Sequence, residues 1–133
     1  MSSGYINIPA GPKSVQEVIL PFTATENIMA FQMVVSVDGI TAEVANNNTT
    51  VQNARTLGMA LSSAPTNSIF NVLMFGTFVD VSFSTFTLNN SIFLSHTGFL
   101  TQIIPTTPDF FVICGKYLGA NTIFINISEP IQL

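Results

Sequence analysis

The side chains that could carry acid–base, nucleophilic or metal chemistry are few. His96 is the only histidine, in the turn-like segment LSHTG, and Cys114 is the only cysteine, inside the apolar run FFVIC. General acid–base catalysis needs such a group beside a second one, and a zinc site needs three or four ligands. We therefore expect His96 to be a solvated or hydrogen-bonded turn residue and Cys114 to be a small buried apolar residue.

The seven acidic residues are scattered along the chain. We expect Asp38 in a turn, Glu43 on a strand, and Asp80, Asp109 and Glu129 near strand ends. No two form an evident catalytic pair, and no phosphate-binding glycine loop, nucleophile elbow or Cys/His metal spacing is present. The sequence predicts no enzyme, no catalytic residue, no cofactor and no metal. An enzyme whose site forms only between subunits stays as a minor alternative.

Composition indicates one domain with much of its surface against other protein. The chain has 133 residues, of which 47% are hydrophobic and 8% charged, against roughly 25% charged in an average soluble domain. A surface with so few charges favours oligomerisation. Nucleic acid is not an expected partner, because Lys13, Arg55 and Lys116 are the only cations in a chain of net charge −4. No secretion signal or membrane span is expected, because the start lacks both basic residues and an apolar stretch, and the richest later run, 69–83, is interrupted by Asn71 and Asp80.

Short runs rich in Val, Ile, Phe and Thr, separated by Gly, Asn, Pro and Ser, predict an all-β fold, a single antiparallel barrel or sandwich. The first strand is expected over 15–22, and Asp38-Gly39 should make a hairpin between MVVSV and ITAEV. Residues 45–54, ANNNTTVQNA, should be a polar surface loop. The apolar run IFNVLMF, ending at Gly76, should be buried on both faces or lie at an interface.

A weak internal repeat divides the chain into two four-strand halves. The segments MVVSV, DGITAEV, LGMAL and NSIFNVLMF correspond, in the same order, to SIFLS, TGFLTQI, CGKYL and NTIFINI. Chance similarity between short apolar strings competes with this interpretation. The shared order and the matching NSIF/NTIF and LG/CG pairs favour a true repeat, with both halves in one barrel or sandwich.

The start of the chain and one aromatic pair are the predicted interaction residues. Residues 1–14, containing IPAGP, are expected to be an extended arm along a surface or a neighbour, with 15–133 as the domain. Phe83 and Phe86 are three apart, so they cannot face the same side of a regular strand. At least one of them should face a partner subunit or mark a bulge. The predicted interaction residues are Ile6, Ile8, Pro9, Pro12, Phe83 and Phe86.

From residue 30 to the end, the chain resembles a small β-barrel module of bacteriophage structural proteins, among them head-decoration (cement) proteins, head fibres and tail-fibre domains. The resemblance rests on LGMAL followed by IFNVLMFG, on VSFSTFTLNNSIFLSHTGFLTQIIP, and on GKYLGANTIFINISEPIQL. Two departures are visible. Members typically have Trp where VSFSTF stands, and a small apolar residue, typically Ala, where Lys116 and Tyr117 stand.

The resemblance implies a virion protein that forms a homotrimer and attaches to a major capsid protein or another virion protein. Decoration proteins of this kind clamp capsid subunits with an N-terminal arm. The expected function is therefore a capsid decoration protein or the base of a head fibre. The alternative is a tail-fibre or lectin-like module that binds a host glycan, although the absence of Trp argues mildly against it.

Overall fold

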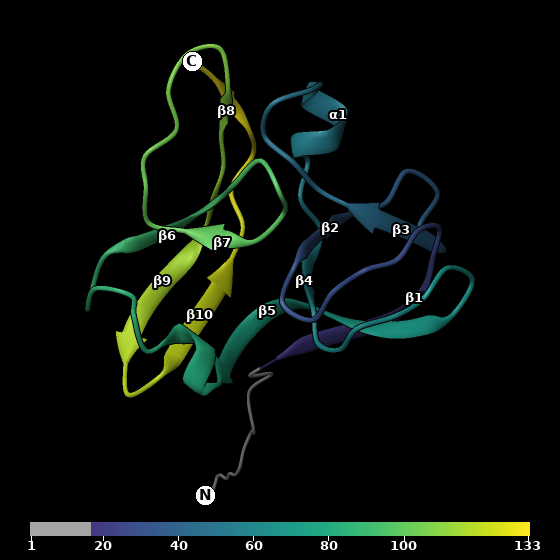
Figure 1. The fold of residues 1–133 in the computed structure, drawn as a ribbon, viewed down its shortest axis with the longest axis horizontal. Coiled ribbons are helices and arrows are strands. Elements are labelled where there is room, and N and C mark those ends of the chain that lie inside the picture. Colours follow the sequence, from purple (N-terminus) through teal and green to yellow (C-terminus); the bar gives the residue numbers. More distant parts are fainter. Residues whose placement is uncertain (1–16) are drawn as a thin grey trace, which may run out of the picture.

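The computed structural model describes residues 17–133, which form strands joined by turns and loops (Figure 1). The strands are β1 (Val18–Ala24), β2 (Met33–Val35), β3 (Thr41–Val44), β4 (Gly58–Ala60), β5 (Ile69–Val79), β6 (Ser91–Leu94), β7 (Leu100–Thr101), β8 (Phe110–Phe111), β9 (Ile113–Gly119), β10 (Thr122–Asn126) and β11 (Ile131–Gln132). The helical elements are single turns, α1 (Val51–Ala54) and η1 (Val81–Phe83). The predicted all-β class is confirmed. Within the described part of the chain, no helix has the length and apolar character to cross a membrane.

One large sheet has the strand order β1-β3-β2-β4-β5-β10-β9-β6-β7. Because β1 also pairs with β5, the first five strands close into a small barrel, whereas the remaining strands continue as an open sheet that ends at β7. The strands are not all antiparallel as predicted, because β1 pairs with β3 in parallel through Thr23↔Thr41 and Ala24↔Ala42. β8 and β11 form a separate two-stranded sheet.

The two halves repeat the same strand arrangement, as the sequence predicted. The order β3-β2-β4-β5 in the first half corresponds to β7-β6-β9-β10 in the second. Gly58 pairs with Val34 between β4 and β2, and Gly115 pairs with Ile92 at the corresponding place between β9 and β6. Positive φ angles also recur at matched positions, namely Phe31 and Asn89, Gly39 and Gly98, and Asn67 and Asn121. These matched positions support a true repeat over chance similarity.

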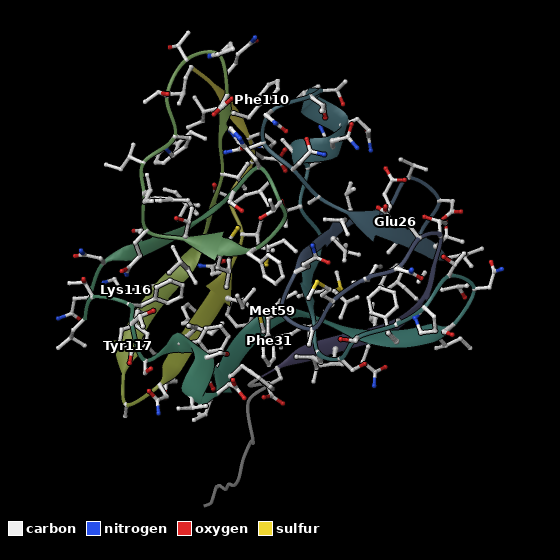
Figure 2. All side chains as sticks on the ribbon, in the orientation of Figure 1. Glu26, Phe31, Met59, Phe110, Lys116 and Tyr117 are labelled. Atoms are coloured by element: carbon white, nitrogen blue, oxygen red, sulfur yellow. The ribbon has the colours of Figure 1, made fainter. Side chains whose placement is uncertain are left out.

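Two apolar clusters form the interior. One cluster fills the barrel with mostly small side chains and two phenylalanine rings. It consists of Phe22, Ala24, Ile28, Val34, Ala42, Ala60, Ala64, Phe70 and Val72. The other joins the halves, because Met59 and Leu73 of the first half are in the same cluster as Ile92 and Ile123 of the second. Figure 2 shows Met59 and Phe31 in the middle of the molecule, between the halves. Strands β2 and β4 are therefore buried on both faces.

Two predicted segments differ from the structure. The strand β5 does not end at Gly76 but continues to Val79, because its last residues pair with β10. Its side chains alternate between buried and exposed over much of its length, so the monomer does not bury both faces. The segment VSFSTF forms the 3-10 turn η1 in place of a strand. The helix ends at Phe83, and the chain then turns, so that Phe83 lies in the central cluster and Phe86 packs against it.

The predicted hairpin at Asp38-Gly39 is confirmed, since β2 and β3 pair antiparallel. The carboxylate of Asp38 accepts hydrogen bonds from the backbone N–H groups of Ile40 and Thr41, each at 2.8 Å, and holds the turn. The loop over 45–54 is polar and partly exposed, but it ends in α1, capped by the Thr50 side chain. The loop was expected on the surface, but its Asn47 is buried.

Candidate interaction site

The groups with possible chemistry do not form a catalytic arrangement. His96 is exposed, and its Nε2 lies 2.7 Å from Oδ2 of Asp109, which precedes β8. In the stretch from residue 17 onward, no three His, Cys, Asp or Glu side chains come together to hold a metal ion. Cys114 is fully buried, and desolvation raises the pKa of its thiol well above the ordinary value, so the thiolate is suppressed.

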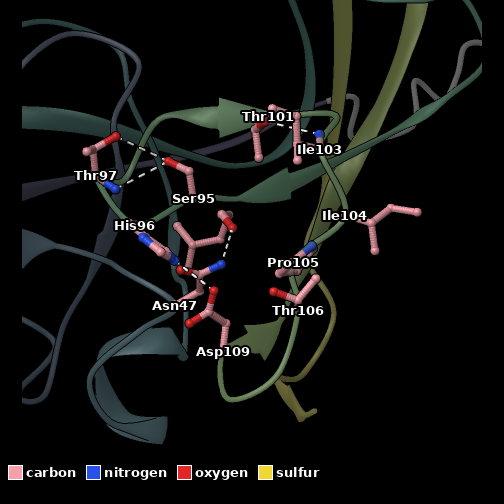
Figure 3. Close-up of a pocket in the computed structure, with 11 residues that line it drawn as sticks. Asn47, Ser95, His96, Thr97, Thr101, Ile103, Ile104, Pro105, Thr106 and Asp109 are labelled. Carbon is pink, nitrogen blue, oxygen red and sulfur yellow. Dashed lines mark hydrogen bonds and ion pairs between the residues drawn. The ribbon is translucent and has the colours of Figure 1, made fainter.

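A cleft of about 410 Å³ opens beside the end of β6 (Figure 3). It is lined by Asn47, Leu94, Ser95, His96, Thr97, Thr101, Ile103, Ile104, Pro105, Thr106 and Asp109. Asn47 is 3% exposed, and its Nδ2 donates to the carbonyl of Leu94 at 2.9 Å. Its Oδ1 accepts no hydrogen bond from residues 17–133. The cleft thus combines apolar walls with hydroxyl, imidazole and carboxylate groups.

A second surface is the apolar outer face, defined by Val18, Phe75, Val79, Leu118 and Phe124 on strands β1, β5, β9 and β10. Phe75 pairs with Val18 across β5 and β1, and its ring contacts that of Phe124 edge-on at 5.2 Å. Val79 is 63% exposed and Leu118 44%. Lys116 points to the same side as Phe124, its partner in the register, and adds one positive charge. Large apolar side chains on neighbouring strands are typical of a surface that meets other protein.

A third feature is the aromatic groove, a hollow of about 170 Å³ between η1 and β7. It is lined by Phe31, Ser82, Phe83, Phe86, Phe99 and Leu100. Phe83 is 4% exposed and belongs to the central core, and its ring stacks on that of Phe86 at 6.1 Å. Phe83 therefore contributes the buried floor of the groove, while the half-buried Phe86 lines its side.

The predicted arm residues Ile6, Ile8, Pro9 and Pro12 lie outside the described residues, as does the predicted domain boundary at 14/15. Their interaction role stays a prediction. The sequence interpretation did not select Ile103 and Ile104, which are 80% and 67% exposed. The sequence did contain a signal for their exposure. The two isoleucines are adjacent and directly precede a proline, in a segment too short to be a core strand.

Comparisons with known proteins give a structural similarity. No family model matches the sequence, and no curated protein matches it. Among solved structures, the N base of the head fibre protein gp8.5 of bacteriophage phi29 aligns with a TM-score of 0.48 and 17% sequence identity. The alignment covers 89% of this chain and 98% of that chain. At this TM-score and identity the similarity carries no conclusion about function.

Proposed function

We propose that this chain is a structural protein of a bacteriophage particle and works by packing against copies of itself and against other virion proteins. The outer face is the observation that carries the proposal. Its exposed apolar side chains occupy adjacent strands of a chain in which 8% of the residues are charged. Burying such side chains stabilises an assembly by about 25 cal/mol per Å². The proposed role is mechanical and includes no enzymatic activity.

The proposed assembly is a homotrimer bound to the phage head, as a decoration (cement) protein or as the base of a head fibre. Three copies held together attach more strongly than one, because each further contact is made within an already bound assembly. The sequence pattern from residue 30 onward, which resembles phage structural modules, supports this choice.

The N-terminal arm is proposed to contact a neighbouring subunit. An extended segment can add main-chain hydrogen bonds to the edge of a neighbour's sheet. Deleting residues 2–13 should leave a folded protein that no longer binds its particle, measured by co-sedimentation with particles that lack the protein. Unchanged binding by the shortened chain would exclude this role for the arm.

Light scattering of the purified protein tests the self-association. A homotrimer of a 14.3 kDa chain has a mass of three such chains. Val79→Asp places a charge on the outer face and should shift the protein towards monomer, because a buried unpaired charge opposes association. Val37→Asp is the matched control, since Val37 is 75% exposed in the β2–β3 turn. A monomeric native protein, or equal effects of the two variants, would contradict the proposal.

The cleft favours one alternative, a module that binds a host glycan. The hydroxyl groups of Ser95, Thr97 and Thr106 and the carboxylate of Asp109 line it, and such groups hydrogen-bond sugar hydroxyls. A glycan-array signal that disappears in Asp109→Ala but not in Val37→Asp would support this alternative.

A further inference from the structure

In the described part of the chain, the two halves differ at one edge of the sheet, which is covered by a strand in the first half and not in the second. In the first half, β1 lies beside β3, and the N–H of Thr23 donates to the carbonyl of Ile40 at 3.0 Å. By the repeat, β7 is the counterpart of β3. Within residues 17–133, no strand pairs with the outward edge of β7, which is the last strand of the order. The second half therefore presents a strand edge where the first half has β1.

At the end of the β7 edge, the side chain of Gln102 forms hydrogen bonds with the backbone of Thr87. Oε1 of Gln102 accepts from the N–H of Thr87 at 2.6 Å, and its Nε2 donates to the carbonyl of Thr87 at 3.0 Å. An amide side chain thus links the segment after η1 to the residue that follows β7. The edge of Leu100 and Thr101 is not covered by this link.

The surroundings of the edge suit an extended apolar peptide. The aromatic groove includes Leu100, and the cleft includes Thr101. Because successive residues of a strand point to opposite faces, the groove and the cleft lie on opposite sides of β7. A strand added to this edge would present alternate side chains to the groove and to the cleft, which is the usual mode of peptide recognition at a sheet edge.

The start of this chain has the matching pattern. Ile6 and Ile8 are two apart and would share one face of a strand, with Tyr5 and Asn7 on the other. Tyr and Ile both favour strands. Pro9 has no N–H to donate and would end the pairing. The apolar face would enter the aromatic groove, and the polar face would meet the cleft.

We propose that the segment Tyr5–Ile8 of one copy pairs with the β7 edge of a second copy, in the position that β1 takes in the first half. This inference rests on the proposed self-association and adds a second contact to the one made by the outer face. The described chain begins at residue 17 beside β5, and β7 is four strands further along the sheet. To reach β7 of the same chain, the arm would have to cross the outer face. A neighbouring copy whose β7 lies beside the start of this chain's β1 would receive the arm directly. Head-to-tail contacts of this kind can close into a ring.

Disulfide trapping between two variants that each carry one added cysteine tests the contact. Asn7→Cys on a tagged chain is mixed with Thr101→Cys on an untagged chain and oxidised mildly, because both side chains would lie on the cleft side of the paired strands. The buried Cys114 stays in place, and wild-type protein controls for its reactivity. The matched control replaces Thr101→Cys with Thr66→Cys, an exposed position in the turn before β5. The tag makes the mixed dimer distinguishable by mass.

The mixed dimer with Thr101→Cys should form about a thousandfold faster than with Thr66→Cys, because docking raises the effective thiol concentration from about micromolar to about millimolar. Equal rates would overturn the inference. So would a disulfide that forms only within single chains of the double variant Asn7→Cys/Thr101→Cys. If light scattering still gives a trimer in either case, this contact is wrong and the proposed function stands. If the native protein is a monomer, both fail.

Discussion

Substituting Gly115 by alanine should destabilise the protein far more than a surface glycine substitution. A Cβ at position 115 would lie 1.7 Å from the carbonyl oxygen of Phe124 and 2.8 Å from its carbonyl carbon, and the φ angle is +157°. Both contacts are backbone atoms of the paired strand β10, so relief requires β9 and β10 to separate. Overpacking costs about 1–3 kcal/mol and backbone strain a similar amount. The expected loss is about 2–6 kcal/mol, against a total stability of about 5–15 kcal/mol.

Gly39→Ala is the control that isolates the backbone strain. Gly39 has a φ of +77°, and a Cβ there would meet nothing within 4 Å. Gly39→Ala should lower the free energy of unfolding by about 1–2 kcal/mol, which is the cost of placing alanine in the left-handed conformation. Urea unfolding followed by circular dichroism, at one protein concentration, gives both losses from the shift in midpoint at constant slope.

The close approach of β9 to β10 is the reason for the expected difference. If Gly115→Ala loses no more stability than Gly39→Ala, the two strands are not packed at this point as described. A change of slope without a change of midpoint would also contradict the reasoning, since it would indicate altered compactness rather than a clash.

Three further predictions concern the titration of Asp38, the reactivity of Cys114 and the contact between His96 and Asp109. Hydrogen bonds from the backbone N–H groups of Thr41 and Ile40 lower the pKa of Asp38 from 3.8 to about 2. The stability that these bonds add should be present above pH 3.8 and lost as the pH falls towards 2. Asp38→Asn should abolish this part of the acid dependence of the urea midpoint. Cys114 should not react with a thiol reagent in the native protein but should react fully in urea, and native labelling would contradict its burial. His96→Ala should change the free energy of unfolding by less than about 1 kcal/mol, because the His96 side chain is 57% exposed; a larger loss would show that the pair holds the loop before β8.

The repeat and most strands could be predicted from the sequence because their signals are local. Alternation and turn residues mark each strand, and Asp38-Gly39 marks the hairpin by its conformational preference. The closure of the barrel could not be predicted, since the pairing of β1 with both β3 and β5 depends on contacts between distant segments. The 3-10 turn at Phe83 was missed because Phe83 and Phe86 were interpreted as strand residues, which alternate with a period of two, although their spacing of three suits a 3-10 turn.

The sites were less predictable than the fold. The cleft combines Asn47 from the first half with residues 94–109 of the second, and only the folded chain brings them together. The outer face was partly predicted, because the run IFNVLMF was expected at an interface or buried. The extension of β5 to Val79 depends on its pairing with β10, which lies more than forty residues later in the sequence.

The closure of the barrel by β1 also has a consequence for biosynthesis. Val18 leaves the ribosome early, but its partner Phe75 is made much later, so the first strand has no place to pair while the chain is growing. Non-local pairing of this kind slows folding and leaves strand edges open to other chains. Incomplete chains that are made in many copies at once would therefore meet one another, and a lower expression level should raise the yield of soluble protein.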